Sequence, residues 1–231
     1  MSSDEWTLER ELCKLTGSQT EREALFQLKL LPSVSKEYQV RTDVDWERGG
    51  DETYIYRFWI RSEGQESGYI IKACVTLDLE RGIEGTILEW VSRRNVLMSN
   101  DISVPQLVYA GQGLIIEELI PWSLLDRMRS NPSTITQILP LLVDYAATLS
   151  RLGFAPIDGF TDLRTRGSDL VVVDFGEDLG PPHMTSVPNL DLLKYLEETL
   201  LRSGIISQRL PANFRQWYFA ASSDHSMHFT K

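Results

Sequence analysis

Two charged residues stand at apolar segments, where a charge is costly to bury unless it is paired. Lys72 interrupts the apolar run 69–75, Tyr-Ile-Ile-Lys-Ala-Cys-Val. Asp174 directly follows three valines at 171–173 and precedes Phe and Gly. A carboxylate at the end of a buried strand can be presented to a metal ion or a substrate. The simpler alternatives are an edge-strand lysine that points to water, and a turn formed by Asp and Gly.

Two further acids lie between a predicted helix and the Asp174 strand. Asp158 and Asp162 both fall in the loop-like segment 153–164, which is rich in Gly and Asp. If the three acids converge in space, Asp158 can accept a proton while Asp162 and Asp174 share a Mg²⁺ ion. The alternative is that the two loop acids are simply solvated.

Hydrophobic periodicity predicts the elements that would position these residues. Aromatic and β-branched runs predict strands, and apolar residues spaced three and four apart predict helices. The elements predicted for the first half are a short helix before residue 30, strands at 54–60 and 69–75, a helix at 80–98, and strands at 104–110 and 114–119. A polar turn bracketed by Gly64 and Gly68 would join the first two strands. Glu84 shares the apolar face of the helix.

The second half is mostly helical. Apolar spacing predicts a helix at 138–152, with Pro140 in its first turn, and a later helix capped by Asn189 and closed by Gly204. The aromatic residues at 217–219 are expected to pack against the body. The pattern is α+β, strand-rich early and helix-rich late, with a break near residue 121.

Composition restricts the classes of partner. The 231 residues carry a formal net charge of −10, which disfavours nucleic acids and anionic lipids as bulk partners. The first residues lack the pattern of a signal peptide, and no apolar stretch approaches the roughly 20 residues that span a bilayer. Neither cysteine belongs to a CxxC pair. We therefore expect a cytoplasmic protein with no membrane partner; its oligomeric state is left open.

The signals above occur in one order: strand lysine, helical glutamate, two glycine-flanked strands, acidic loop and Asp-Phe-Gly. In this order the chain resembles the protein-kinase-like superfamily, and within it most closely the aminoglycoside and choline phosphotransferase branch. The resemblance spans roughly residues 40–204. It implies a bilobal α+β fold, with a strand-rich N-lobe and N-terminal helical extension in 1–120 and a reduced helical C-lobe in 121–231.

The same resemblance implies a role for each strand and helix residue. Lys72 would neutralise the phosphates of ATP, and Glu84 would pair with that lysine. Glu80 and Glu89 are alternatives to Glu84, which is preferred for its place on the apolar face. Adenine would bind to backbone groups of the segment made of Glu118, Leu119 and Ile120.

In the acidic loop, the resemblance makes Asp158 the catalytic base and Asp174 a Mg²⁺ ligand. Two positions depart from the family pattern. Pro156 stands where the family has a histidine, and Leu163 stands where it has a metal-binding asparagine. Asp162, one residue earlier, is the nearest substitute for that asparagine.

Three functions follow from these observations. The first is an ATP-dependent phosphotransferase that moves the γ-phosphoryl group to an unknown hydroxyl acceptor, on a small molecule or a protein. The second is a pseudokinase that binds a nucleotide or a partner without transfer. Lys72, Asp158 and Asp174 stand in register, which favours the first, and the missing loop His and Asn favour the second. The phosphate-loop segment 48–53, with two glycines beside two acids, also departs from the family pattern. The third is a scaffold in which all these residues are structural.

Overall fold

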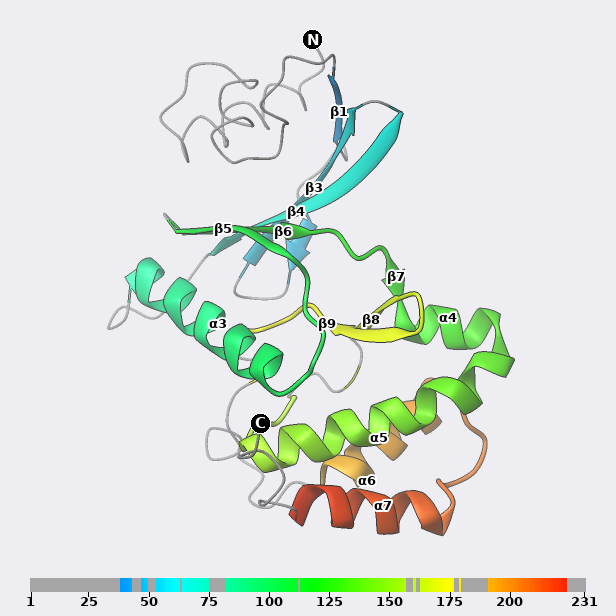
Figure 1. Cartoon of the computed structure of the whole chain (residues 1–231). Helices are drawn as coiled ribbons and strands as arrows, with labels where there is room; N and C mark the ends of the chain where they lie inside the picture. Colours follow the sequence, from blue (N-terminus) through cyan, green and yellow to red (C-terminus); the bar gives the residue numbers. More distant parts are fainter. Residues whose placement is uncertain are drawn as a thin grey trace. The chain divides into compact units, whose positions relative to one another are not determined.

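The computed structural model describes residues 38–42, 47–49, 53–62, 64–74, 82–111, 113–156, 160, 163–176, 179 and 191–223. The chain divides into two compact units, Met1–Ser92 with Pro105–Leu119 and Arg93–Val104 with Ile120–Lys231. The first unit is rich in strands and the second in helices, which confirms the predicted α+β class (Figure 1). Residues 93–104, which the sequence places with the strands, belong to the helical unit. The helix predicted before residue 30 lies outside the described residues.

One six-stranded antiparallel sheet forms the strand-rich unit, and its order is β1-β3-β4-β6-β5, with β2 paired to β3. The strands are β1 (Tyr38–Thr42), β2 (Glu47–Gly49), β3 (Thr53–Ser62), β4 (Gln65–Cys74), β5 (Leu107–Gly111) and β6 (Leu114–Glu118). Both predicted strand pairs, β3–β4 and β5–β6, are confirmed as antiparallel neighbours. Their apolar and aromatic sequences explain this, because such side chains pack well on a pleated surface.

The β3–β4 hairpin turns earlier than predicted. Ser62 is paired with Gln65, so Gly68 lies within β4, opposite Trp59, and not in the turn. A Cβ atom at position 68 would come within 3.0 Å of Trp59 Nε1 and 3.1 Å of Leu119 Cδ2. Glycine is therefore needed here for a close side-chain approach, not for a turn.

The core of the strand-rich unit is formed by cross-strand pairs on one face of the sheet. Phe58 lies opposite Tyr69 in the register, and their rings are stacked with centroids 5.3 Å apart. Ile71 lies opposite Ile116, and both side chains are fully buried. Directly opposed pairs such as these stabilise antiparallel sheets and fix their register.

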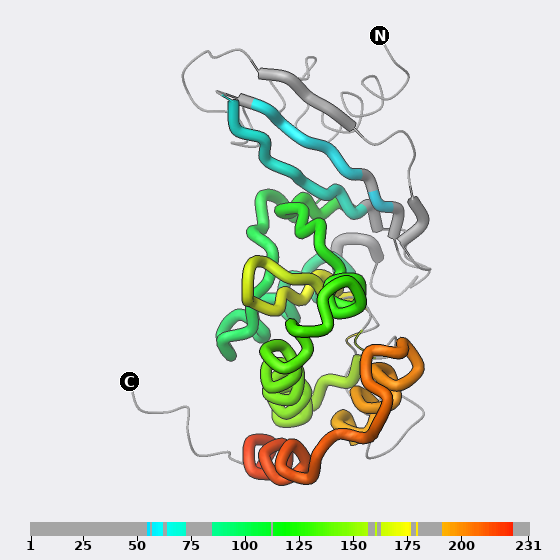
Figure 2. Tube along the Cα trace, turned by 90° about the vertical axis from the view of Figure 1, so that its right-hand side faces the viewer, coloured from blue at the N-terminus to red at the C-terminus, as the bar shows by residue number. Residues whose placement is uncertain are grey.

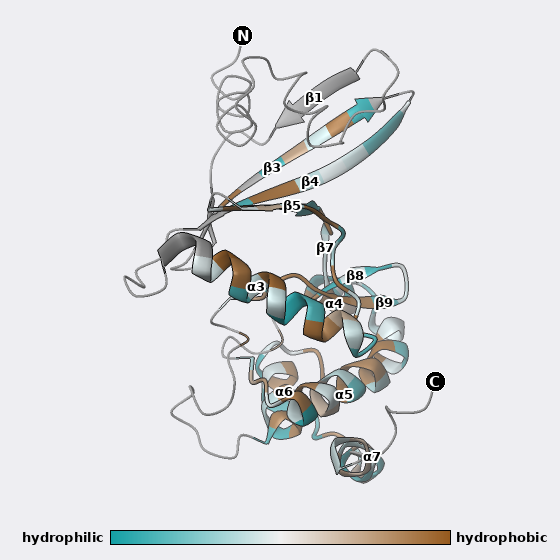
Figure 3. Cartoon of the chain, turned by 60° about the vertical axis from the view of Figure 1, so that its left-hand side comes forward, coloured by the Kyte–Doolittle hydropathy of each residue, from teal (hydrophilic) through white to brown (hydrophobic). Residues whose placement is uncertain are grey.

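Helix α3 (Gly82–Ser99) follows β4 in the chain and confirms the predicted helix 80–98. The boundary between the two units falls within this helix, between Ser92 and Arg93. Figure 3 shows a polar stretch near the middle of α3, with hydrophobic patches on either side. Two buried arginines, Arg93 and Arg94, lie in the part of α3 that belongs to the helical unit.

In its described residues, the helical unit contains four more helices and a small sheet. The helices are α4 (Leu124–Ser130), α5 (Ile135–Leu152), α6 (Leu192–Arg202) and α7 (Ala212–Ser223), with a 3₁₀ turn η1 (Pro132–Thr134). The antiparallel sheet has the order β7 (Trp122–Ser123), β8 (Leu163–Arg166) and β9 (Asp169–Val172). Helix α5 packs against both α6 and α7 (Figure 2). Within the described ranges, every helix is too short or too polar to cross a lipid bilayer.

Helix ends depart from the sequence prediction in two places. Pro140 lies inside α5 and not in its first turn, because the helix begins at Ile135, directly after η1. Helix α6 is capped by Asp191, whose side chain accepts a hydrogen bond from Lys194 N at 3.1 Å. The predicted cap, Asn189, lies outside the described residues. Gly204, with φ of +68°, closes α6 as predicted.

Of the three aromatic residues at positions 217–219 of α7, only one is buried. Tyr218 is 4% exposed, but Trp217 and Phe219 are 38% and 52% exposed. The expectation that all three pack back on the body therefore holds for Tyr218 alone. A helix with one buried stripe exposes the neighbouring positions, because residues one apart point about 100° away from each other.

Candidate functional site

Lys72 lies in the middle of the sheet and not on an edge strand. Its strand, β4, is hydrogen-bonded to β3 on one side and to β6 on the other. Lys72 is opposite Ile115, so its side chain shares a face with Ile115 and with Glu117, two residues further along β6. Lys72 Nζ lies 2.7 Å from Glu117 Oε1, and the two side chains are only 11% and 1% exposed. The edge-strand alternative is therefore wrong.

Glu117 is a site residue that the sequence analysis missed. The sequence pattern predicts that Lys72 pairs with Glu84 of α3, whose side chain lies outside the described residues. A signal was available: Glu117 interrupts an apolar strand, as Lys72 does, and two opposite charges in apolar strands are expected to meet. What the sequence alone does not provide is the β4–β6 register that brings them together.

The segment predicted to bind adenine is already bonded within the sheet. Glu118 N donates to Gln106 O at 2.9 Å, and Leu119 N donates to Gly68 O at 2.9 Å. Glu118 Oε2 also accepts a hydrogen bond from Gln106 N at 3.1 Å. These two amides are therefore used by the fold, and an adenine bound at Glu118 to Ile120 would need other backbone groups of the segment.

Asp174 begins a short turn, residues 174–176, that we call the Asp174 loop. Strand β9 ends at Val172, and the Asp174 Oδ1 atom accepts a hydrogen bond from Gly176 N at 3.0 Å. Asp174 is half-buried, whereas Phe175 is only 3% exposed. An Asp side chain that accepts a hydrogen bond from the amide two residues ahead forms a local turn. The alternative reading of Asp174 and Gly176 as a turn is therefore correct. This turn uses only one of the two carboxylate oxygens.

Arg93 binds the outer side of the Asp174 loop. Its Nη1 atom donates to Phe175 O at 3.2 Å and also to Gly176 O. The Arg93 side chain is buried. In such surroundings a hydrogen bond to the guanidinium group is strong, and an unpaired N–H group would cost stability. The Asp174 loop is thus held by two kinds of hydrogen bond: one within the loop, to the Asp174 carboxylate, and others from Arg93 of α3.

The described residues are compatible with a nucleotide-borne Mg²⁺ ion. Within the part of the chain that the structure describes, no three His, Cys, Asp or Glu side chains are grouped closely enough to bind a metal ion by themselves. Mg²⁺ is usually bound by one or two carboxylates together with phosphates and waters, a role for which Asp174 alone is sufficient. Asp158 and Asp162 lie outside the described residues.

Leu163 and Pro156, the two residues that depart from the pattern of the family that the chain resembles, are both buried. Leu163 is the first residue of β8, lies opposite Val172 and is 3% exposed. Position 163 therefore belongs to the apolar core of the small sheet, and its leucine side chain cannot bind a metal ion. Pro156 is buried shortly after the end of α5.

No family model matches the sequence, and no curated protein matches it. Solved structures similar to this chain include the Rio2 kinase of Chaetomium thermophilum in an ADP/Mg²⁺-phosphoaspartate complex (TM-score 0.48, 13% identity over 88% of this chain and 66% of that chain). Others are Rv3197 of Mycobacterium tuberculosis with erythromycin (0.39, 10%, 76% and 56%) and a mutant of the Neurospora crassa PAN3 pseudokinase (0.35, 13%, 88% and 60%).

The chain spans less than two thirds of each of these structures. Two are named as a kinase and a pseudokinase, but every identity is at or below 13% and every TM-score is below 0.5. They assign this chain to no family or branch. We therefore base the function on the residues of this chain.

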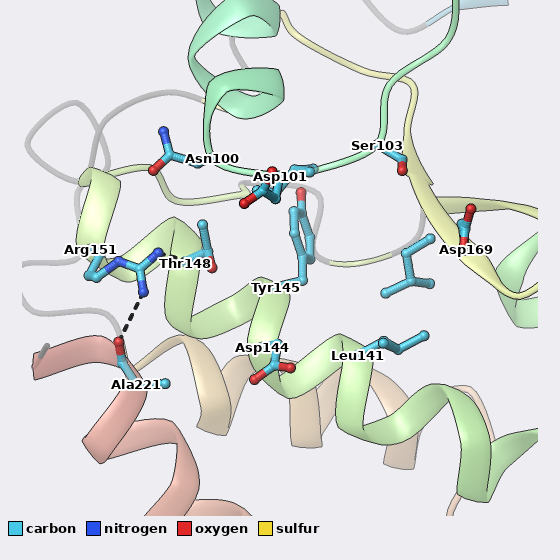
Figure 4. Close-up of a pocket in the computed structure, with 12 residues that line it drawn as sticks. Asn100, Asp101, Ser103, Leu141, Asp144, Tyr145, Thr148, Arg151, Asp169 and Ala221 are labelled. Carbon is cyan, nitrogen blue, oxygen red and sulfur yellow. Dashed lines mark hydrogen bonds between the residues drawn. The ribbon is translucent and has the colours of Figure 1, made fainter. Parts of the chain in front are cut away.

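The helical unit also contains a pocket of about 440 Å³. Its walls come from residues 100–103 after α3, from α5, from the start of β9 and from the end of α7. Figure 4 shows the Tyr145 ring rising from α5 toward the 100–103 segment, and Arg151 Nη1 donating to Ala221 O at 3.2 Å. Asp174 is not among the lining residues, so this pocket is distinct from the Asp174 loop.

Asp144, one of the residues that line this pocket, should lower the stability of the fold at neutral pH. Its side chain is exposed, yet partial desolvation of the carboxyl group raises its pKa. A raised pKa disfavours the charged form in the folded state, so the penalty is absent below the unfolded pKa of about 3.9 and appears as the pH rises above it. Asp144→Asn should raise the melting temperature at pH 7 and leave it unchanged at pH 3. Solvent screening limits the gain to less than about 1 kcal/mol, and an equal gain at both pH values would contradict this explanation.

Proposed function

We propose that this chain binds ATP with Mg²⁺ and transfers the γ-phosphoryl group to a hydroxyl acceptor on a small molecule or protein. The observation that carries the proposal is the Asp174 loop. A half-buried carboxylate follows strand β9, whose last two residues are buried, and the loop that carries it is held by two separate sets of hydrogen bonds. A carboxylate held in place in this way is suited to bind the metal ion, because it need not reorganise when the nucleotide arrives.

The predicted residues other than Glu84 each have a role in this proposal. Asp174, helped by Asp162, would hold the Mg²⁺ ion, which when bound neutralises charge on the phosphate oxygens. Lys72 would contact the phosphates, and the acceptor hydroxyl would give its proton to Asp158. The adenine would bind to backbone groups in the segment that ends at Ile120.

A second candidate, a pseudokinase that binds a nucleotide or a partner without transfer, is favoured by a specific observation. The Lys72 ammonium is buried and lies 2.7 Å from the Glu117 carboxylate. A lysine whose charge is balanced within the sheet attracts a phosphate less strongly than one with a free charge. Leu163, in the core of β8, also favours this candidate because it replaces a metal-binding residue.

The Asp158→Asn variant separates the two candidates. Under the phosphotransferase proposal, release of phosphate from ATP and self-phosphorylation should both fall by roughly 100-fold or more, because the base acts in the transition state. ATP affinity should remain close to wild type. Asp169→Asn, an exposed acid on β9, is a matched control that should leave transfer unchanged. If Asp158→Asn transfers phosphate as fast as wild type, the Asp158 loop takes no part in catalysis. If wild-type protein binds ATP but transfers no phosphate, the pseudokinase candidate is supported.

A further inference from the structure

We propose that Arg93 is a positioning residue that holds the Asp174 loop in the conformation that presents Asp174 to the nucleotide-bound metal. The inference rests on the proposed function and extends it to a residue of α3 that no sequence motif marks. Arg93 does not itself contact substrate in this proposal. It acts through the peptide groups of Phe175 and Gly176.

The hydrogen bonds of Gly176 connect Arg93 to Asp174. The Gly176 carbonyl accepts from Arg93 Nη1, and the Gly176 amide donates to Asp174 Oδ1 at 3.0 Å. The carbonyl of Phe175, the preceding residue, accepts from the same Arg93 nitrogen at 3.2 Å. Two consecutive carbonyls are thus turned toward α3. Because each peptide group is planar, fixing the Phe175 carbonyl also fixes the Gly176 amide that bonds the carboxylate.

Packing alone does not explain an arginine at position 93. Its side chain is 7% exposed, and a buried guanidinium carries a large desolvation cost that an apolar side chain of similar size avoids. The compensation visible here is the pair of bonds to the Asp174 loop. Arginine suits this task because its rigid, always charged fork donates several hydrogen bonds in a fixed geometry.

The same stretch of chain holds the strand that precedes the Asp174 loop. Ser103, four residues beyond the end of α3, forms a parallel bridge with Val171, and its carbonyl accepts from Val172 N at 3.0 Å. Strand β9 is therefore fixed by Ser103, and the loop that follows it by Arg93. Without Arg93, the strand would remain anchored while the loop lost its contact with α3.

The test compares Arg93→Met and Arg93→Lys with a matched control, Arg94→Met, which removes the neighbouring buried arginine of the same helix. The first readout is hydrogen exchange at the Gly176 amide without nucleotide. The second is the ratio of ATP affinities with and without Mg²⁺. For Arg93→Met we expect exchange to rise roughly 10- to 100-fold and the Mg²⁺-dependent gain in affinity to be lost, with the Mg²⁺-free affinity retained. Arg93→Lys should recover part of both, and Arg94→Met should change neither.

Three results would overturn the inference. The first is a Gly176 amide that stays protected in Arg93→Met. The second is faster exchange with an unchanged Mg²⁺ dependence, because Arg93 would then order the loop without serving the metal site. The third is an equal effect of Arg94→Met, which would show general damage to α3. If Arg93→Met fails to fold by circular dichroism, the Arg93→Lys variant decides by the same two readouts. Wild-type protein that binds no ATP would instead refute the proposed function, and Gly176 exchange would still test the loop contact.

Discussion

Replacing Glu117 by alanine is expected to destabilise the strand-rich unit by about 3–5 kcal/mol. The variant removes the carboxylate that lies 2.7 Å from the Lys72 ammonium, while the lysine stays buried in the central strand β4. An uncompensated buried charge is costly because the sheet cannot replace the water that the ammonium gave up. Urea unfolding followed by circular dichroism measures the loss.

The double variant Lys72→Met with Glu117→Leu should recover most of that stability. Well-packed apolar residues in place of a buried ion pair are often neutral or stabilising, so the coupling between the two sites should be large. The exposed Arg61–Glu66 pair on the same hairpin, with Arg61 Nη2 to Glu66 Oε2 at 3.1 Å, is the control. Glu66→Ala should cost less than about 1 kcal/mol. A loss below about 1 kcal/mol for Glu117→Ala would show that the Lys72 charge is balanced by other groups.

Replacing Asp174 by alanine should abolish the Mg²⁺-dependent part of ATP binding. We expect the affinity for ATP in the presence of Mg²⁺ to fall roughly 10- to 100-fold, because a charge-assisted ligand to the metal is lost. Binding of ATP without Mg²⁺ should change little. Isothermal titration calorimetry with and without Mg²⁺ measures both affinities.

The Asp174→Asn variant distinguishes the role of Asp174 in the turn from its proposed role in Mg²⁺ binding. Its amide oxygen can still accept the hydrogen bond that Gly176 N donates to Asp174 Oδ1, so the loop should be preserved while the charge is lost. The variant should therefore keep a protected Gly176 amide and lose the Mg²⁺ dependence. Asp169→Ala, at the other end of β9, is the matched control. An Asp174→Ala protein with wild-type Mg²⁺ dependence would leave Asp174 as a turn residue only.

The elements of the sheet could be predicted from the sequence because their signals are local. The aromatic and β-branched run of β3 and the apolar run of β4 are typical of strands whatever surrounds them. The polar residues between Gly64 and Gly68 predict a turn that ends at Gly68, but the role of Gly68 is set by the Trp59 and Leu119 side chains that approach it. Pro140 was placed too near the helix start because the apolar spacing of α5 is clear only after its first residues.

The candidate site was less predictable because its contacts are not local. Glu117 reaches Lys72 through the β4–β6 register, and residues about 45 apart in the chain carry no short-range signal of that pairing. Arg93 was missed for another reason: its partners are backbone carbonyls of Phe175 and Gly176, which every residue type provides. Asp174 stands out as a candidate in the sequence itself, because a carboxylate directly follows three valines.

Direct titration of the wild-type protein with ATP, with and without Mg²⁺, is the measurement that tests the central claim most directly. We predict that ATP binds to the folded protein, that Mg²⁺ tightens the binding, and that both ligands together raise the melting temperature by mass action. AMP, which lacks the β- and γ-phosphates, should bind without any Mg²⁺ effect. Absence of heat and of any thermal shift at millimolar ATP and Mg²⁺, in a sample folded by circular dichroism, would contradict a nucleotide site in this chain.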